Sequence, residues 1–98
     1  MSKNKNIAIL GSGESGVGAA VLAKKQGFDV FVSDFGKIKE EYKAVLEKEN
    51  IEWEEGAHTL ERILKASEII KSPGIPDKVE VVQKALEKSI PVISEIEF

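Results

Sequence analysis

The sequence predicts an α/β fold, a doubly wound five-stranded parallel sheet with helices on both faces. Short apolar runs alternate with helical patterns along the whole length of the chain. The first of these runs, residues 7–10, is continuously apolar, as a parallel strand covered on both faces must be. A glycine-rich turn follows it directly. Right-handed crossovers between such units give the parallel sheet.

The first half of the chain contains three predicted strands. Residues 7–10 form the first, which ends at Gly11, and residues 30–32 form the second, which reaches Asp34. Residues 51–54 form a weaker third strand with an exposed face or at a sheet edge, because its apolar residues alternate with acids. Two helices separate the strands, and the second is amphipathic. The first helix is predicted over residues 15–26, because apolar residues and Lys24 recur at helical spacing and Gly27 ends the pattern. Its spaced residues are Val17, Ala20, Val21 and Lys24. The second helix is predicted from the spacing of Ile38, Tyr42, Val45 and Leu46.

The second half of the chain repeats the pattern. Thr59 is a candidate cap for a short helix that carries Leu60, Ile63 and Leu64. Residues 69–70 form a fourth strand, and residues 91–93 form a fifth. Between them, Asp77 and Glu80 resemble a capping box at the start of a helix with Val79, Val82 and Leu86.

Composition bounds the function. A chain of 98 residues has room for one domain, so we expect residues 1–98 to form a single unit. The net charge of −3 disfavours a nucleic-acid or anionic-membrane partner. The absence of cysteine excludes disulfides, thiolate metal sites and a cysteine nucleophile. The early apolar run is too short for a signal peptide or membrane span, so a cytoplasmic protein is expected.

The glycine-rich turn is a G-x-G-x-x-G motif, residues 11–16, between the first strand and the first helix. Its glycines permit a tight turn, a close approach of a phosphate to the backbone, and close packing of the helix on the sheet. Amide groups at the helix start then face an anion, and Ser15 adds a hydroxyl or caps the helix. Glu14 would repel a diphosphate unless its side chain points to water. Phosphate binding is favoured over a purely structural turn.

Two further segments lie where doubly wound folds bind ligands. Asp34 ends the second strand, where an acid accepts hydrogen bonds from a sugar hydroxyl; a turn with Gly36 is the alternative. Lys37 lies just beyond, either solvated or in reach of a base or phosphate. Residues 72–74, Ser-Pro-Gly, follow the fourth strand and form either a preorganised wall for a ligand or a plain strand-to-helix turn.

Other polar residues do not suggest catalysis or metal binding. His58 has neither a cysteine partner nor a second histidine, so a loop or capping role is expected. Trp53 is expected to be half-buried, and the pairs Glu40-Glu41 and Glu54-Glu55, together with residues 47–49, are expected on solvated faces. Because no nucleophile, base and orienting group occur together, the chain resembles a binding module without catalytic residues.

Taken together, these segments resemble the N-terminal domain of the Mur ligase family of bacterial peptidoglycan synthesis, over essentially all 98 residues. The segments that carry the resemblance are residues 9–16, 32–34, 70–76 and 94–98. The Ser-Pro-Gly-Ile-Pro sequence after the fourth strand is the specific one. The resemblance implies a Rossmann-like domain that binds the UDP part of UDP-N-acetylmuramoyl-L-alanine.

The resemblance also implies which residues hold the nucleotide. Glu14 and Ser15 would lie at the diphosphate through their backbone amides, Asp34 would lie near the uridine, and the Ser-Pro-Gly segment, residues 72–74, would lie along the nucleotide. Family members often carry a Thr-Arg pair for uracil where this chain has Phe35, Gly36 and Lys37, so Phe35 would stack on the base and Lys37 would substitute in part. The implied substrate-binding set is Gly13, Glu14, Ser15, Gly16, Asp34, Phe35, Lys37, Ser72, Pro73 and Gly74.

The family's chemistry implies that this chain is a fragment. A central domain binds ATP and Mg²⁺ and phosphorylates the alanine carboxylate, D-glutamate then attacks the acyl phosphate, and a C-terminal domain closes over the site. The chain has no G-x-x-x-x-G-K-[ST] motif, so it would hold only the UDP substrate and be inactive alone, with no cofactor of its own. The end of the sequence, without a helix after the last strand, also predicts a domain boundary.

Two alternatives from other classes remain. The glycine turn and Asp34 fit an NAD-binding Rossmann domain of an oxidoreductase, or a small nucleotide sensor, equally well. The Ser-Pro-Gly segment favours the ligase. A non-binding interaction domain would follow if the glycine turn proved occluded.

Overall fold

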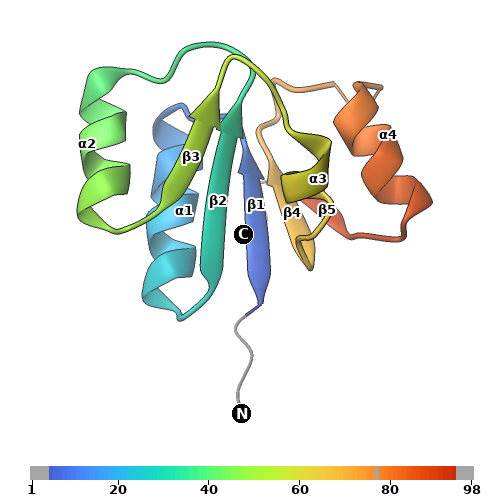
Figure 1. Cartoon of the computed structure of the whole chain (residues 1–98), viewed down its shortest axis with the longest axis horizontal. Helices are drawn as coiled ribbons and strands as arrows, with labels where there is room; N and C mark the ends of the chain where they lie inside the picture. The colour runs from blue at the N-terminus through green and yellow to red at the C-terminus, as the bar shows by residue number, and fades with distance from the viewer. Residues whose placement is uncertain (1–4, 77, 95–98) are drawn as a thin grey trace.

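The computed structural model describes residues 5–76 and 78–94, in which strands and helices alternate (Figure 1). Parallel strands require such crossover helices, because the chain must return to the edge at which the previous strand began. The strands are β1 (Asn6–Leu10), β2 (Asp29–Asp34), β3 (Glu52–Glu55), β4 (Glu68–Lys71) and β5 (Val92–Ser94). The helices are α1 (Glu14–Lys25), α2 (Glu40–Lys48), α3 (Leu60–Ile63) and α4 (Glu80–Glu87).

The five strands form one parallel sheet in the order β3-β2-β1-β4-β5, which confirms the predicted doubly wound architecture. The chain winds outward from β1 to β3, returns to pair β4 with the free side of β1, and winds outward again. The direction of winding therefore reverses between β1 and β4. At such a switch point the loops diverge to opposite faces and leave a crevice at the carboxyl edge of the sheet.

Alternate side chains of each strand enter two separate cores, one on each face. On the first face Ile9 and Val32 pack with residues of α1 and α2, and on the second Leu10 and Ile69 pack with residues of α3 and α4. Figure 1 shows the two helix pairs on opposite sides of the sheet. The central strand β1 is apolar on both faces for this reason, as its sequence predicted. The two cores hold the loops at the switch point in fixed positions.

Helix boundaries differ in detail from those predicted. Gly13 is the N-cap of α1, so the predicted cap Ser15 lies inside the helix and is exposed. Small residues, Ala19, Ala20 and Ala23, form the buried side of α1 together with Val17, whereas Val21 and Lys24 are only partly buried. Ile38 is buried but precedes α2, and Val45 is exposed. These small side chains let α1 approach the sheet closely, and the helical pattern predicted from the sequence included only Ala20 among them.

The predicted capping box before α4 is wrong. Asp77 lies outside the described residues, but α4 begins at Glu80 with Val79 at the N-cap position and no side-chain cap. Its buried residues are Val81, Val82 and Ala85, and Leu86 is 53% exposed, so the apolar face is rotated from the predicted one. Thr59 is the N-cap residue of α3, as predicted, although its hydroxyl does not make the capping bond.

The third strand, β3, is at the sheet edge, as its alternating acids indicated. Trp53 is half-buried against the first core, and Lys43 Nζ of α2 lies 5.0 Å from the centre of its ring. Residues 95–98, at which the chain was expected to reach a domain boundary, lie outside the described residues. In the described part of the chain, no helix is both long and apolar enough to cross a lipid bilayer.

Candidate functional site at the carboxyl edge of the sheet

A cavity of about 740 Å³ lies at the carboxyl edge of the sheet, beside the switch point. The loops after β1, β2, β3 and β4 and the start of α4 all contribute to it. Its volume is in the range of small-molecule sites. The lining residues are Gly11, Ser12, Gly13, Asp34, Phe35, His58, Leu60, Ser72, Gly74, Ile75, Pro76, Val79, Glu80 and Val81.

Gly11 is required by the fold itself. Its φ of +104° lies in the region that only glycine adopts readily, and its N–H donates to Ser33 O at 2.9 Å. A Cβ built on Gly11 would lie 2.9 Å from Ser72 Cβ, so the loops after β1 and β4 touch at this point. The first glycine of the motif therefore joins the two sides of the switch point.

Gly13 is not required by the fold in the same way. Its φ of −69° and ψ of −174° suit any residue, and a Cβ built there would meet no atom within 4 Å. Gly13 nevertheless lines the cavity. The two glycines therefore differ. The backbone conformation requires Gly11, whereas Gly13 leaves the space beside the start of α1 free of a side chain.

The start of α1 supplies backbone donors next to this space. Val17 N–H donates to Gly13 O at 2.9 Å and closes the first turn, so the amides of Glu14, Ser15 and Gly16 precede the first intrahelical bond. Glu14 and Ser15 are exposed and Gly16 is buried. An acid in the first turn interacts favourably with the positive end of the helix dipole, which gives Glu14 a structural role.

Asp34 accepts hydrogen bonds from two loops through its carboxylate. Its Oδ1 accepts the Gly36 N–H at 2.8 Å, which is the turn considered above as the alternative to ligand binding. Its Oδ2 accepts both the backbone N–H of Ser12, at 2.8 Å, and the Ser12 hydroxyl. The acid thus fixes the glycine turn from the end of the neighbouring strand.

These bonds lower the pKa of Asp34. Partial burial acts to raise it, but the hydrogen bonds from the Ser12 hydroxyl, the Gly36 N–H and the Ser12 N–H, aided by His58, outweigh that effect. A carboxyl whose pKa is lower in the folded state stabilises the fold above its unfolded pKa, and this contribution is lost as the pH falls through the folded value. The contribution of Asp34 to stability therefore begins to decrease in acid, below the ordinary pKa of aspartic acid of about 3.9.

We predict that Asp34→Asn lowers the free energy of unfolding by about 1–2 kcal/mol at pH 7, because the amide cannot accept all three bonds as strongly. The difference from the unchanged chain should be smaller at pH 3, below the ordinary pKa of aspartic acid of about 3.9, because the unfolded chain then takes up a proton that the hydrogen-bonded carboxylate of the fold resists. Urea unfolding of both proteins at the two pH values measures this. The pH-dependent contributions of the other carboxylates to stability are the same in both proteins and cancel in the difference.

Asp29→Asn is the matched control, since Asp29 is the exposed acid at the other end of β2 and makes no side-chain hydrogen bond to any residue that the structure describes. It should leave stability nearly unchanged at both pH values. A gap for Asp34→Asn that stays constant between pH 7 and pH 3 would contradict the role of its charge.

The segment after β4 forms the opposite wall of the cavity. Ser72 N–H donates to Leu10 O at 3.0 Å, and Ile75 N–H donates to Ser72 O at 3.0 Å, which closes a tight turn around Pro73 and Gly74. The Ser72 hydroxyl accepts the Gly74 N–H at 3.3 Å, and Lys71 Nζ donates to Ile75 O at 2.7 Å. The wall is therefore held to β1 by its own backbone.

Contrary to the sequence interpretation, Glu54 and Glu55 are not simply solvated. Glu54 accepts hydrogen bonds from the Ser33 hydroxyl, at 2.8 Å, and from the backbone N–H and hydroxyl of Thr59. Glu55 accepts from the Ile38 N–H, at 2.9 Å, and from Lys43. Burial acts to raise the pKa of Glu54, but these bonds lower it, and the Ile38 N–H lowers that of Glu55. Both acids tie β3 to its neighbouring loops.

Half of the predicted binding residues line the cavity, namely Gly13, Asp34, Phe35, Ser72 and Gly74. Phe35 is 72% exposed, which is unusual for a large apolar side chain. Glu14, Ser15 and Gly16 lie on the adjacent first turn of α1, and Pro73 lies in the turn between Ser72 and Gly74. Lys37 is exposed and does not line the cavity.

Sequence reasoning missed several lining residues. Ser12 occupies a variable position of the glycine motif, and His58 follows an edge strand, so neither carries a local signal of its role. The apolar side of the cavity comes from Leu60, Ile75, Val79 and Val81. The sequence placed Leu60 and Val79 on helices and predicted a binding role for none of the four. Across the described ranges, 5–76 and 78–94, no three acidic or histidine side chains are placed to hold a metal ion.

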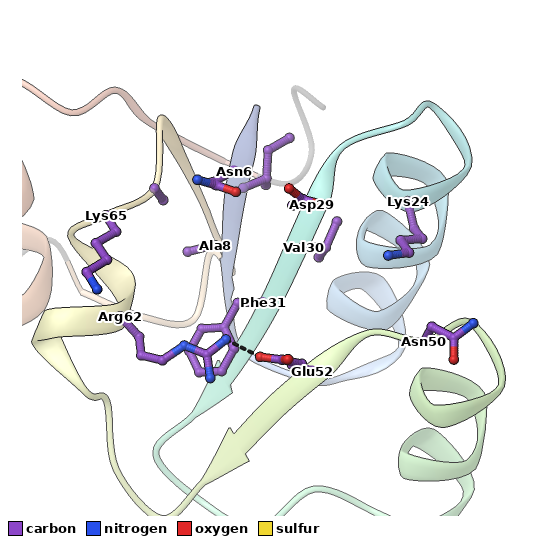
Figure 2. Close-up of a pocket in the computed structure, with 12 residues that line it drawn as sticks. Asn6, Ala8, Lys24, Asp29, Val30, Phe31, Asn50, Glu52, Arg62 and Lys65 are labelled. Carbon is purple, nitrogen blue, oxygen red and sulfur yellow. Dashed lines mark hydrogen bonds and ion pairs between the residues drawn. The ribbon is translucent and has the colours of Figure 1, made fainter. Parts of the chain in front are cut away.

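A second cavity, of about 320 Å³, is lined by residues at the opposite edge of the sheet (Figure 2). Asn6 and Asp29 begin β1 and β2 there. Arg62 of α3 lies over the ring of Phe31, 4.0 Å from its centre, and pairs with Glu52. Arg62 thus covers apolar surface of β2 with its guanidinium group, a packing role. None of the motif residues lines this cavity.

Comparison with known proteins gives one family. The family model of the MurD N-terminal domain matches residues 6–81. A UDP-N-acetylmuramoylalanine--D-glutamate ligase of Christiangramia forsetii is 58% identical over 94 residues, which are 96% of this chain and 21% of the relative. The corresponding ligase of Bacteroides fragilis is 56% identical over the same length. The chain therefore spans about a fifth of the length of these relatives.

Solved structures show the same fold. A pseudomurein peptide ligase type C of Methanothermus fervidus superposes with a TM-score of 0.79 at 32% identity, over 96% of this chain and 19% of that one. An imine reductase of Myxococcus stipitatus in complex with NAD⁺ superposes with a TM-score of 0.67 at 14% identity, over 94% of this chain and 32% of that one. The second likeness shows the fold alone.

Proposed function

Because the chain belongs to the MurD N-terminal domain family, we propose that it binds the UDP part of UDP-N-acetylmuramoyl-L-alanine at the carboxyl edge of its sheet. The observation that carries this proposal is the geometry of Gly13. A glycine that the backbone does not need, with no atom near the place of its missing side chain, lies at the N-terminus of α1 and lines the larger of the two cavities. A phosphate that approaches the backbone closely explains why a side chain is absent there.

The diphosphate would lie at the first turn of α1. The amides of Glu14, Ser15 and Gly16 and the positive end of the helix dipole are suited to an anion, and the exposed Ser15 hydroxyl is a further donor. Glu14 is exposed, so its carboxylate can remain in water away from the phosphates. Asp34 supports this arrangement by fixing Ser12, the residue before Gly13.

The uridine would lie between the ends of β2 and β4. Phe35 has an exposed ring beside the cavity, which suits stacking on a base. Ser72, Pro73 and Gly74 form the wall along which the nucleotide extends. Lys37 lies outside the cavity lining, so its contact would require the flexible side chain to extend toward a bound base or phosphate.

For the whole protein we propose the activity that the relatives' name gives, the ligation of D-glutamate to UDP-N-acetylmuramoylalanine. We further propose, from the resemblance to the Mur ligase family, that this reaction uses ATP and belongs to cytoplasmic peptidoglycan synthesis. ATP and Mg²⁺ would be held by a central domain, and a C-terminal domain would complete the site. Residues 1–98 would then be the N-terminal substrate-binding domain. Since the chain contains no P-loop motif, it should form no ADP from ATP, D-glutamate and UDP-N-acetylmuramoyl-L-alanine, and ADP formation would contradict this division of labour.

Titration of ¹⁵N-labelled chain with UDP, UDP-N-acetylmuramoyl-L-alanine and NAD tests the binding proposal. We expect amide shifts at Gly13, Ser15 and Gly74 with both uridine nucleotides. Shifts of these amides with NAD alone would instead support an oxidoreductase domain. The absence of shifts with all three ligands at millimolar concentration would favour an interaction domain.

A further inference from the structure

His58 lies on the loop between β3 and α3 and lines the same cavity as the glycine turn. Its ring is 5.7 Å from that of Phe35, centre to centre, with a tilt of 37°. The proposed function gives His58 no role. Its position next to the exposed aromatic ring places it where the nucleobase would lie.

The hydrogen bonds around Ser33 determine where the imidazole carries its proton. Ser33 is completely buried, and its Oγ lies 2.8 Å from Glu54 Oε2, 3.2 Å from Ala57 O and 2.6 Å from His58 Nδ1. A hydroxyl has one proton to donate, and an ionised carboxylate and a carbonyl can only accept. The Ser33 proton is therefore used toward Glu54 or Ala57.

His58 must then be the donor in its contact with Ser33, so its Nδ1 carries a proton. In a neutral imidazole the other nitrogen, Nε2, is left as an acceptor. Burial lowers the pKa of His58, against the opposite effect of Glu54 on β3 and Asp34 on β2, and this favours the neutral ring. Within the described residues, His58 makes no other hydrogen bond, so Nε2 is available to a ligand.

We propose that His58 is a specificity-determining residue for the nucleobase, with Nε2 accepting the N3–H of uracil. This inference rests on the proposed binding of UDP. Uracil has a donor at N3, whereas cytosine has a lone pair there, so the same nitrogen would attract the first base and repel the second. Ser33 and Glu54 act as positioning residues, because they fix the tautomer that makes Nε2 an acceptor.

The tautomer can be measured directly, because His58 is the only histidine in the chain. Two-bond ¹⁵N–¹H spectra of the free protein at pH 7.5 should show one imidazole with its proton on Nδ1. The Nε2 resonance should shift when UDP is added. A proton on Nε2 in the free protein would overturn the inference.

Binding of UDP and CDP to the unchanged chain and to His58→Phe tests the specificity. Phenylalanine keeps a ring beside Phe35 and removes both nitrogens. We expect the unchanged chain to prefer UDP by about tenfold or more, and His58→Phe to bind the two nucleotides within about twofold of each other. Phe35→Leu is the matched control: it should weaken both nucleotides and preserve their ratio.

The outcomes separate this inference from the proposed function. If UDP fails to shift the amides of Gly13 and Ser15, the proposed function fails, and the role of His58 fails with it. If UDP shifts these amides but His58→Phe keeps the preference of the unchanged chain, only the role of His58 is refuted. Ser33→Ala, which frees the tautomer, should reduce the preference without removing the ring.

Discussion

Gly13→Val should abolish most UDP binding and leave the fold intact. The valine side chain would occupy the open space beside the first turn of α1, at the position proposed for the diphosphate. A steric conflict of about 3 kcal/mol corresponds to about a hundredfold loss of affinity. Calorimetric or NMR titration with UDP measures it.

The stability of Gly13→Val should change by no more than about 1 kcal/mol. The backbone angles of Gly13 suit valine, and the lower entropy of the unfolded chain opposes the poorer N-cap. Gly18→Val is the matched control, because Gly18 is exposed on the same helix and a Cβ there also meets no atom within 4 Å. It should bind UDP as the unchanged chain does. Undiminished UDP binding by Gly13→Val would refute the role of the glycine turn.

The parallel sheet and the edge at which the candidate site lies follow from local patterns in the sequence. Ile9 and its neighbours are apolar without interruption because β1 is covered on both faces, and that physical requirement is readable in four residues. A glycine motif after such a strand can only lie at the carboxyl edge of a parallel sheet. Ser72 follows β4 and so lies at the same edge.

The roles of the polar side chains depend on contacts between distant segments, which no local pattern encodes. Asp34 bonds to Ser12, and Glu54 bonds to Ser33, in each case across a crossover. A short acidic run at an edge strand is usually solvated. The hydrogen bonds of Glu54 to Ser33 and Thr59 could therefore be recognised only from the structure. The tautomer of His58 depends on this same set of contacts.

Gly11→Ala should be strongly destabilising, by about 3 kcal/mol, for two reasons that can be separated. The first is the positive φ, which costs an alanine about 1 kcal/mol or more. The second is the contact between the new Cβ and Ser72 Cβ, which could be relieved only by moving the loop after β1 or the loop after β4. Urea unfolding gives the free energy of unfolding for each variant.

Gly27→Ala isolates the cost of the backbone angle, since Gly27 has a φ of +95°, close to the +104° of Gly11, and no atom within 4 Å of a built Cβ. It should cost about 1 kcal/mol. Ser72→Gly, introduced into Gly11→Ala, removes the atom that the new Cβ meets. Relative to the effect of Ser72→Gly in the unchanged chain, it should restore about 1–2 kcal/mol of the free energy of unfolding. Equal losses of stability for Gly11→Ala and Gly27→Ala would show that the loops after β1 and β4 can separate at little cost.

The wall formed by Ser72 and Gly74 would then not be fixed relative to the glycine turn. The nucleotide site would in that case be formed only when the ligand binds, and not by the fold alone.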